Sequence, residues 1–416
     1  MTRHQIDPRT VTESDLARHL LAARGIQWMR GNRGDPYALI LRAQGIDPHR
    51  LFPGLRGAPV IRQSETDVWV TVDHAAGRQI LADPRLRLRD QAAAKRRKRV
   101  FTIDSRTSLK HVLSVDDAVL AMDRAEHDRL RPIAERILAP DADEVTRVFA
   151  ETLAKTLANT SANTGGRFDL MTDFARPATV SVLAELTGVP AGARDDHAAA
   201  CAGAGPALDA TLCPPTLAMT TRLVAAYDAI RETFAGHDAG HDEDARAVGL
   251  LAAVAGTEVT TNLICDAVLA LLDHPDQWRL LRAEPDRAPD AVEEALRFAP
   301  PVRLESRIAA EDAEVAGQAV GRGDQVVVLV DAANRDPAVF AEPDRFDLTR
   351  TSSAGHLALP EGSSTSLVAA PARLLAGAAL RVLADTVPEL RTDGDVVRRM
   401  RSPVVRGIAR CPVASQ

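Results

Sequence analysis

Apolar residues recur at three- and four-residue offsets over most of the chain, which is the spacing of one buried face of an α-helix. The longest such stretch spans 245–272 and predicts a long, largely buried helix. Further helices are expected over 15–42 with a break at 31–36, over 73–81, over most of 118–188 and over 289–298. Proline and glycine near the ends of these stretches mark their boundaries.

Only short stretches have the pattern of β-strands. Residues 66–72 alternate around Trp69, and 313–315 and 325–330 are separated by glycine-containing turns. Together with the helices, these strands predict a mainly α fold with small β-sheets. We expect a single domain over 1–416, made of an N-terminal helical extension (1–45) and a larger body (46–416).

The composition of the chain argues against several classes of function. The chain of 416 residues is 45% hydrophobic and 26% charged, which is typical of a soluble globular protein. Its net charge of −6 gives no attraction to nucleic acid or to an anionic membrane. The N-terminus is polar and we expect no apolar run long enough to span a bilayer, so a cytoplasmic location is predicted. The four cysteines have no CxxC spacing and are interpreted as buried thiols.

Two local patterns have open alternatives. The basic run at 95–99 either docks an acidic partner or is a solvated loop, and the solvated loop is the commoner case. His237 and His241 lie among carboxylates, but neighbouring glycines favour an irregular loop over a metal site. No metal is therefore expected.

Residues 356–373, followed by an apolar helical pattern, resemble the haem-binding loop of cytochrome P450 proteins. Ser366 stands where that family has the cysteine that ligates iron, and no cysteine lies within 40 residues of it. Glu294 and Arg297 match the family's ExxR motif, and Arg345 matches the arginine of its PxRF segment. The resemblance implies a cytochrome P450-like fold in which these three residues form a structural triad.

The same resemblance shows which residues differ from the family's catalytic pattern. Glu258 matches the acid of the family's proton-relay motif, but Val259 replaces the alcohol that follows it. In the loop, Pro371 sits where a helix tolerates proline only in its first turn, so the next helix should begin near residue 370. The loop also departs from the family pattern at three further positions, Pro360, Ser364 and Val368.

These changes predict that no haem is bound and that monooxygenase activity is lost, because a neutral hydroxyl cannot replace the thiolate that promotes O–O cleavage. The resemblance assigns the positions that contact haem propionates to His127, Arg131 and Arg307. If the haem site is vestigial, these side chains should pair with local carboxylates instead.

One subgroup of the family is more similar still, namely the P450-like auxiliary proteins of deoxysugar glycosyltransferases in macrolide and anthracycline biosynthesis. The matching residues lie in 24–28, 34–37, 397–404 and 411–413. The resemblance implies a non-catalytic activator that binds a cognate nucleotide-sugar glycosyltransferase and needs no cofactor. Candidate interface residues are Arg24, Trp28 and Tyr37, although core packing is an alternative for the two rings.

Two other functions stay open at this stage. A haem-binding oxidoreductase with an unusual or absent thiolate ligand would show a Soret band. A ligand-binding protein would be stabilised by small molecules without any partner.

Overall fold

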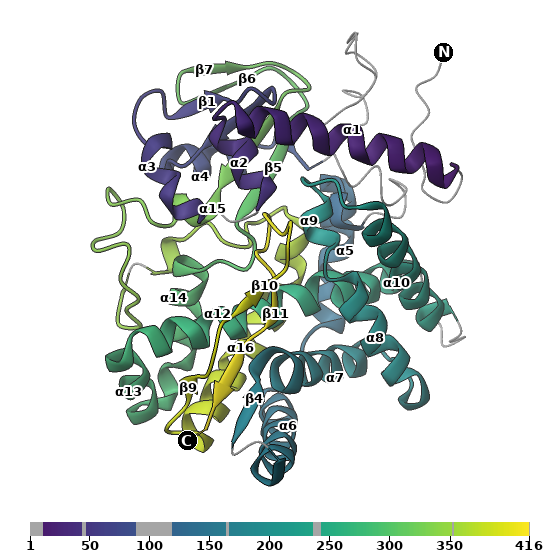
Figure 1. Cartoon of the computed structure of the whole chain (residues 1–416), viewed down its shortest axis with the longest axis vertical. Helices are drawn as coiled ribbons and strands as arrows, with labels where there is room; N and C mark the ends of the chain where they lie inside the picture. Colours follow the sequence, from purple (N-terminus) through teal and green to yellow (C-terminus); the bar gives the residue numbers. More distant parts are fainter. Residues whose placement is uncertain are drawn as a thin grey trace.

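The computed structural model describes residues 11–43, 47–88, 119–163, 166–235, 243–351 and 353–415. It confirms the predicted class, because helices form most of the body and the sheets are small (Figure 1). The basic run at 95–99 and the histidines at 237 and 241 lie outside the described residues.

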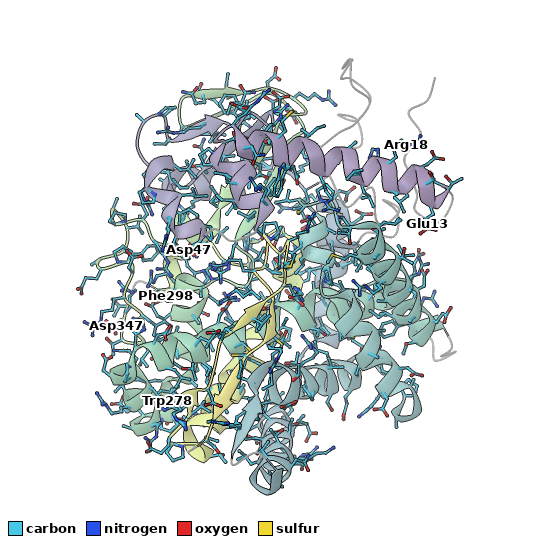
Figure 2. All side chains as sticks on the ribbon, viewed as in Figure 1. Glu13, Arg18, Asp47, Trp278, Phe298 and Asp347 are labelled. Carbon is cyan, nitrogen blue, oxygen red and sulfur yellow. The ribbon has the colours of Figure 1, made fainter. Side chains whose placement is uncertain are left out.

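Two helices form the N-terminal stretch. Helix α1 (Glu13–Asn32) begins where the Thr12 side chain accepts a hydrogen bond from the backbone N–H of Asp15. Gly34, in the left-handed region at φ +93°, reverses the chain before α2 (Pro36–Arg42), which Asp35 caps. Glu13 and Arg18 lie at the end of α1 that extends along the edge of the molecule (Figure 2).

A five-stranded sheet follows, in the order β1-β2-β8-β5-β3. Strands β2 and β8 are parallel and the other neighbours are antiparallel. All five residues of β8 are buried, as expected for a central strand that is covered on both faces. The strands are β1 (Ile61–Gln63), β2 (Val68–Thr71), β3 (Leu86–Arg87), β5 (Leu304–Ala309) and β8 (Gln325–Leu329).

Three smaller sheets contain the remaining strands. One joins β4 (Arg167–Asp169), β12 (Pro412–Ala414) and β9 (Arg391–Thr392); the others are the hairpins β6–β7 (Ala313–Val315 and Gln318–Val320) and β10–β11 (Val397–Arg398 and Ile408–Arg410). The tip of the β10–β11 hairpin reaches the short helix α9 (Ala207–Ala210) (Figure 1).

The helical body surrounds one long central helix. This helix runs from α11 (Glu243–Leu251) through a π-helical segment, η8 (Ala252–Gly256), into α12 (Thr257–Asp273). The other long helices are α5 (Arg124–Ile137), α6 (Ala142–Asn163), α7 (Arg176–Leu186), α8 (Arg194–Ala204), α10 (Leu217–Ala235), α13 (Pro275–Ala283), α14 (Ala288–Phe298) and α16 (Ala369–Thr386). Shorter helical elements include η1 (Pro48–Arg50), α3 (Phe52–Leu55), α4 (His74–Ala82), the π-helical η6 (Leu170–Ala175), α15 (Val330–Ala333) and η11 (Ser364–Val368).

Two helical stretches are long and apolar enough to cross a membrane, contrary to the sequence expectation. They are Glu243–Asp273 and Ser364–Thr386, and their most apolar windows lie wholly or mostly inside the protein. Their hydropathy is therefore accounted for by their place in the core.

A fully buried ion pair anchors α14 to the loops around it. Glu294 and Arg297 lie one turn apart, with Nη2 2.8 Å from Oε1 and Nε 2.9 Å from Oε2. Arg297 also donates to the carbonyls of residues 334, 343 and 345. Glu294 further accepts from the backbone N–H of Asp347 and from the hydroxyl of Ser353. These bonds offset the cost of burying both charges.

The prediction that Arg345 completes this network is wrong. Its side chain is 50% exposed and pairs with Asp276 at the surface, because its backbone carbonyl is the group that faces Arg297. Arg350, only 9% exposed, takes the place instead, with its Nε 3.2 Å from Glu294 Oε1.

Substitutions of these residues should show that the buried network contributes more to the free energy of unfolding than the surface pair of Arg345 does. Glu294→Gln leaves the Arg297 charge without a counterion and should cost about 3–5 kcal/mol of unfolding free energy. Arg350→Gln should cost about 1.5–3 kcal/mol, because it removes a hydrogen bond to a buried charge. Arg345→Gln is the matched control and should cost less than about 1 kcal/mol.

Denaturant unfolding followed by circular dichroism measures all three variants. A larger loss for Arg345→Gln than for Arg350→Gln would contradict the assignment.

Candidate functional site

Ser366 lies on the short 3₁₀-helix η11, between the loop that begins at residue 356 and α16. Its Oγ donates to the carbonyl of Ser363 at 2.7 Å and lies 2.9 Å from Nε2 of His127 on α5. His127 is buried, and a hydroxyl has one proton and two lone pairs, so Ser366 can bond to both partners at once. Both hydrogen-bonding functions of Ser366 are therefore engaged within the protein.

The residues after Ser366 pack directly against the central helix. A Cβ placed on Gly256 in η8 would lie 3.5 Å from Cγ1 of Val368 and 3.3 Å from Cδ1 of Leu183. Val368 is buried, and α16 begins at Ala369, which confirms the helix start predicted from Pro371. A side chain at position 256 would therefore touch both Val368 and Leu183, so the loop and the central helix lie close together at Gly256.

The two arginines assigned to haem propionates both pair with carboxylates. Arg131 makes a two-pronged contact with Glu361 at 2.7 and 3.2 Å. Arg307 and Glu305, two residues apart on β5 and therefore on the same face, lie 3.0 Å apart and are both buried. Burial raises the pKa of Glu305, and the neighbouring Arg307 opposes that rise. One nitrogen of Arg307, Nη2, has no hydrogen-bond partner within the described residues.

The acid of the relay motif is held in a second ion pair. Glu258 on α12 is buried and pairs with Arg399 from the β10–β11 hairpin, with Nη1 3.1 Å from Oε2. Asn262, one turn later, donates to Glu258 Oε1 at 2.6 Å. Val259 lies in the apolar core, so the position directly after the acid carries no hydroxyl. A carboxylate bound in this way is not placed to shuttle protons.

Asp209 on α9 is a buried site residue that the sequence did not reveal. It accepts hydrogen bonds from the hydroxyl of Ser402 and from the backbone N–H groups of Val404 and Val405. Burial raises its pKa to about 6, and Arg399 acts in the opposite direction. This contact fixes the hairpin over α9, and the only sequence signal for it was the motif at 397–404.

These residues do not fit a haem. The group at the ligand position is a neutral hydroxyl already bound to His127 and Ser363. Val368 is buried, and its Cγ1 lies 3.5 Å from where a Cβ on Gly256 would stand, so the loop lies close to the helix that would face the macrocycle. The unused Nη2 of Arg307 offers one donor but no iron ligand. In the described part of the chain no group of three or more His, Cys, Asp or Glu side chains is placed to hold a metal.

The three candidate interface residues differ in how far they are exposed. Tyr37 is buried in the core, so the prediction that it serves as an exposed interface residue is wrong; the apolar face of the short helix α2 turns it inward. Arg24 is partly buried, and desolvation lowers its pKa. Trp28 is 45% exposed, and the guanidinium carbon of Arg42 lies 3.5 Å from its ring centroid.

Trp28 is part of an exposed apolar stripe on α1. The other members are Leu21, 68% exposed, and Met29, 47% exposed. They lie seven and eight residues apart, which places them on one side of the helix, opposite the buried face formed by Leu16, Leu20, Ala23, Gln27 and Gly31. We refer to Leu21, Trp28 and Met29 as the α1 stripe.

The chain is similar over nearly its whole length to known proteins of one family. A family model described as Cytochrome P450 matches residues 220–358. Protein AknT of Streptomyces galilaeus is 44% identical, over 97% of this chain and 96% of its own length. The cytochrome P450 family protein EryCII of Saccharopolyspora erythraea is 35% identical, over 97% of this chain and 99% of its own.

A solved structure of the same family has the same fold. The ligand-free structure of CYP164A2 from Mycobacterium smegmatis superposes with a TM-score of 0.73 at 28% identity, covering 91% of this chain and 99% of that one. Sequence identity over nearly the whole length and the shared fold show that this chain belongs to the cytochrome P450 family.

Proposed function

We propose that this protein is a non-catalytic, haem-free auxiliary protein that acts in the cytoplasm. In this proposal it binds, stabilises and activates a cognate nucleotide-deoxysugar glycosyltransferase of antibiotic biosynthesis. The similarity to AknT and EryCII over almost the full length supports a role in the same subgroup. The resemblance of 24–28, 34–37, 397–404 and 411–413 to P450-like auxiliary proteins suggests the class of partner.

The observation that supports the non-catalytic part is the close approach of Val368 to the helix at Gly256, together with the bond between Ser366 and His127. In this proposal the loop leaves too little room for haem, and a hydroxyl stands at the ligand position. Oxygen activation requires an iron ligand that donates electron density, and a hydroxyl engaged in two hydrogen bonds does not supply it.

The α1 stripe is the best-supported surface for the partner. Large aromatic side chains dominate binding energy when they are held in place before binding. Arg42 lies over one face of the Trp28 ring and also donates to Asn32 at 2.8 Å, so the ring is oriented in the free protein. A stable interface buries about 800 Å² on each partner. The stripe would therefore be the centre of a larger contact.

Activation then needs no chemistry from this chain. A protein that binds only the folded, competent form of an enzyme stabilises that form by mass action. At a free concentration of 100 times Kd the gain is about 2.7 kcal/mol, which is enough to rescue a marginally stable transferase.

Trp28→Ala should weaken binding to the cognate glycosyltransferase by about thirtyfold, the effect of losing about 2 kcal/mol at a hot spot. Isothermal titration calorimetry with the purified partners measures this. Val339→Ala, at a residue of similar exposure far along the chain, is the matched control and should bind like the wild type. Equal affinity of Trp28→Ala and Val339→Ala would exclude the α1 stripe from the interface.

Haem content tests the other half of the proposal. Protein produced with excess haem precursor should show no Soret band, and Ser366→Cys alone should not create one, because Val368 still contacts the central helix. Ser366→Cys combined with Val368→Gly should take up more haem than either single variant. A Soret band in the wild-type protein would favour the alternative function, a P450-type oxidoreductase with an unusual ligand.

A further inference from the structure

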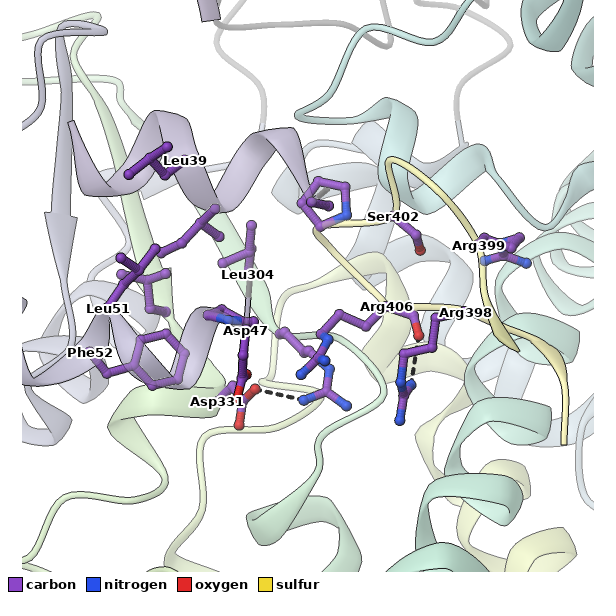
Figure 3. Close-up of a pocket in the computed structure, with 16 residues that line it drawn as sticks. Leu39, Asp47, Leu51, Phe52, Leu304, Asp331, Arg398, Arg399, Ser402 and Arg406 are labelled. Carbon is purple, nitrogen blue, oxygen red and sulfur yellow. Dashed lines mark hydrogen bonds and ion pairs between the residues drawn. The ribbon is translucent and has the colours of Figure 1, made fainter. Parts of the chain in front are cut away.

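A cavity of about 300 Å³ separates the N-terminal α2–α3 stretch from the β10–β11 hairpin. Its two sides differ in chemistry. Figure 3 shows the apolar side chains of Leu39, Leu51 and Phe52 on one side and those of Arg398, Arg399 and Arg406 on the other. None of the residues that fill the space between η11 and the central helix lines this cavity.

Three of the four arginines that line the cavity are neutralised by carboxylates. Arg303 lies 2.6 Å from Asp331 and 3.2 Å from Asp266. Arg398 lies 2.8 Å from the other oxygen of Asp266. Arg399 pairs with Glu258. Their charges are paired within the protein, so these three guanidinium groups stabilise the wall of the cavity.

Arg406 is different, because its side chain has no hydrogen bond or ion pair with any described residue. It lies on the hairpin at a left-handed backbone position, φ +48°. Burial lowers its pKa to about 10, and the like charges of Arg303 and Arg398 add to that effect, while Asp331 and Asp266 act in the opposite direction. A half-buried guanidinium among other cations is unfavourable unless an anion pairs with it. The fork of donors suits a carboxylate, which it can bind through two parallel hydrogen bonds.

We propose that this cavity binds a small organic monocarboxylate, with the carboxylate on Arg406 and an apolar body against Leu39, Leu51 and Phe52. A second negative charge is disfavoured because Asp331 and Asp47 also line the cavity. The volume is at the lower end of the range for small-molecule sites, about 300–1,000 Å³, so the ligand is a compact acid. This site is independent of haem and of the glycosyltransferase.

Octanoate is the probe, titrated into the isolated chain by calorimetry, with 1-octanol and inorganic phosphate as matched ligands. Octanoate should bind saturably at one site. Octanol, which lacks the charge, and phosphate, which lacks the apolar body, should each bind at least about tenfold more weakly. Phosphate binding as tightly as octanoate would overturn the proposal, as would the absence of saturable octanoate binding.

Variants of the hairpin locate the anion. Arg406→Gln should weaken octanoate binding by at least about tenfold, and Arg406→Lys, which keeps the charge but not the fork, should fall between it and the wild type. Arg410→Gln, on an exposed residue of β11, is the control and should leave the affinity unchanged. Arg406→Gln breaks no pair, so its circular dichroism spectrum should match the wild type. Equal octanoate affinity of Arg406→Gln and the wild type would overturn the assignment.

Discussion

The close approach of Val368 to the central helix at Gly256 is the constraint on which the proposed function depends. Both residues are buried, and the segments that carry them belong to the core of the fold. The resemblance places a cofactor between this loop and the central helix, and in this chain the two lie close together. Under the proposed function, close packing here supplies the contacts that a bound macrocycle would otherwise make.

The former polar contacts of the site are reused within the protein. His127 now binds Ser366, Arg131 binds Glu361 and Arg307 binds Glu305. On the other side of the central helix, Glu258 holds Arg399 of the C-terminal hairpin. Charged side chains that are left unpaired in a protein interior are costly, and each of these has found a partner. Under the proposed function, these side chains stabilise the fold in place of a haem site.

Much of the fold follows from local patterns. The 245–272 periodicity, the cap at Thr12 and the proline at 371 each specify a helix or its boundary through interactions within a few residues. The prediction that monooxygenase chemistry is lost rests on the identity of Ser366 and of Val259. These inferences need only the sequence, because they concern what a residue type can do.

The failures all concern contacts between distant segments. Arg345 and Arg350 lie on one loop far from Glu294 in sequence, and only the direction of that loop decides that Arg350 reaches it. Tyr37 faces the core because the buried side of α2 carries it. Arg406 has no ion pair with a carboxylate of the described residues because the hairpin places it at the cavity that α3 also lines. The bond between His127 and Ser366 joins residues 239 apart, which no periodicity can reveal.

The most direct test of the account is the rate of sugar transfer by the cognate glycosyltransferase, measured while purified, colourless chain is added in increasing amounts. We expect the rate to rise saturably and to level off at a fixed ratio of the two proteins, because the chain acts by binding. A rate that does not change with added chain would contradict the proposed function.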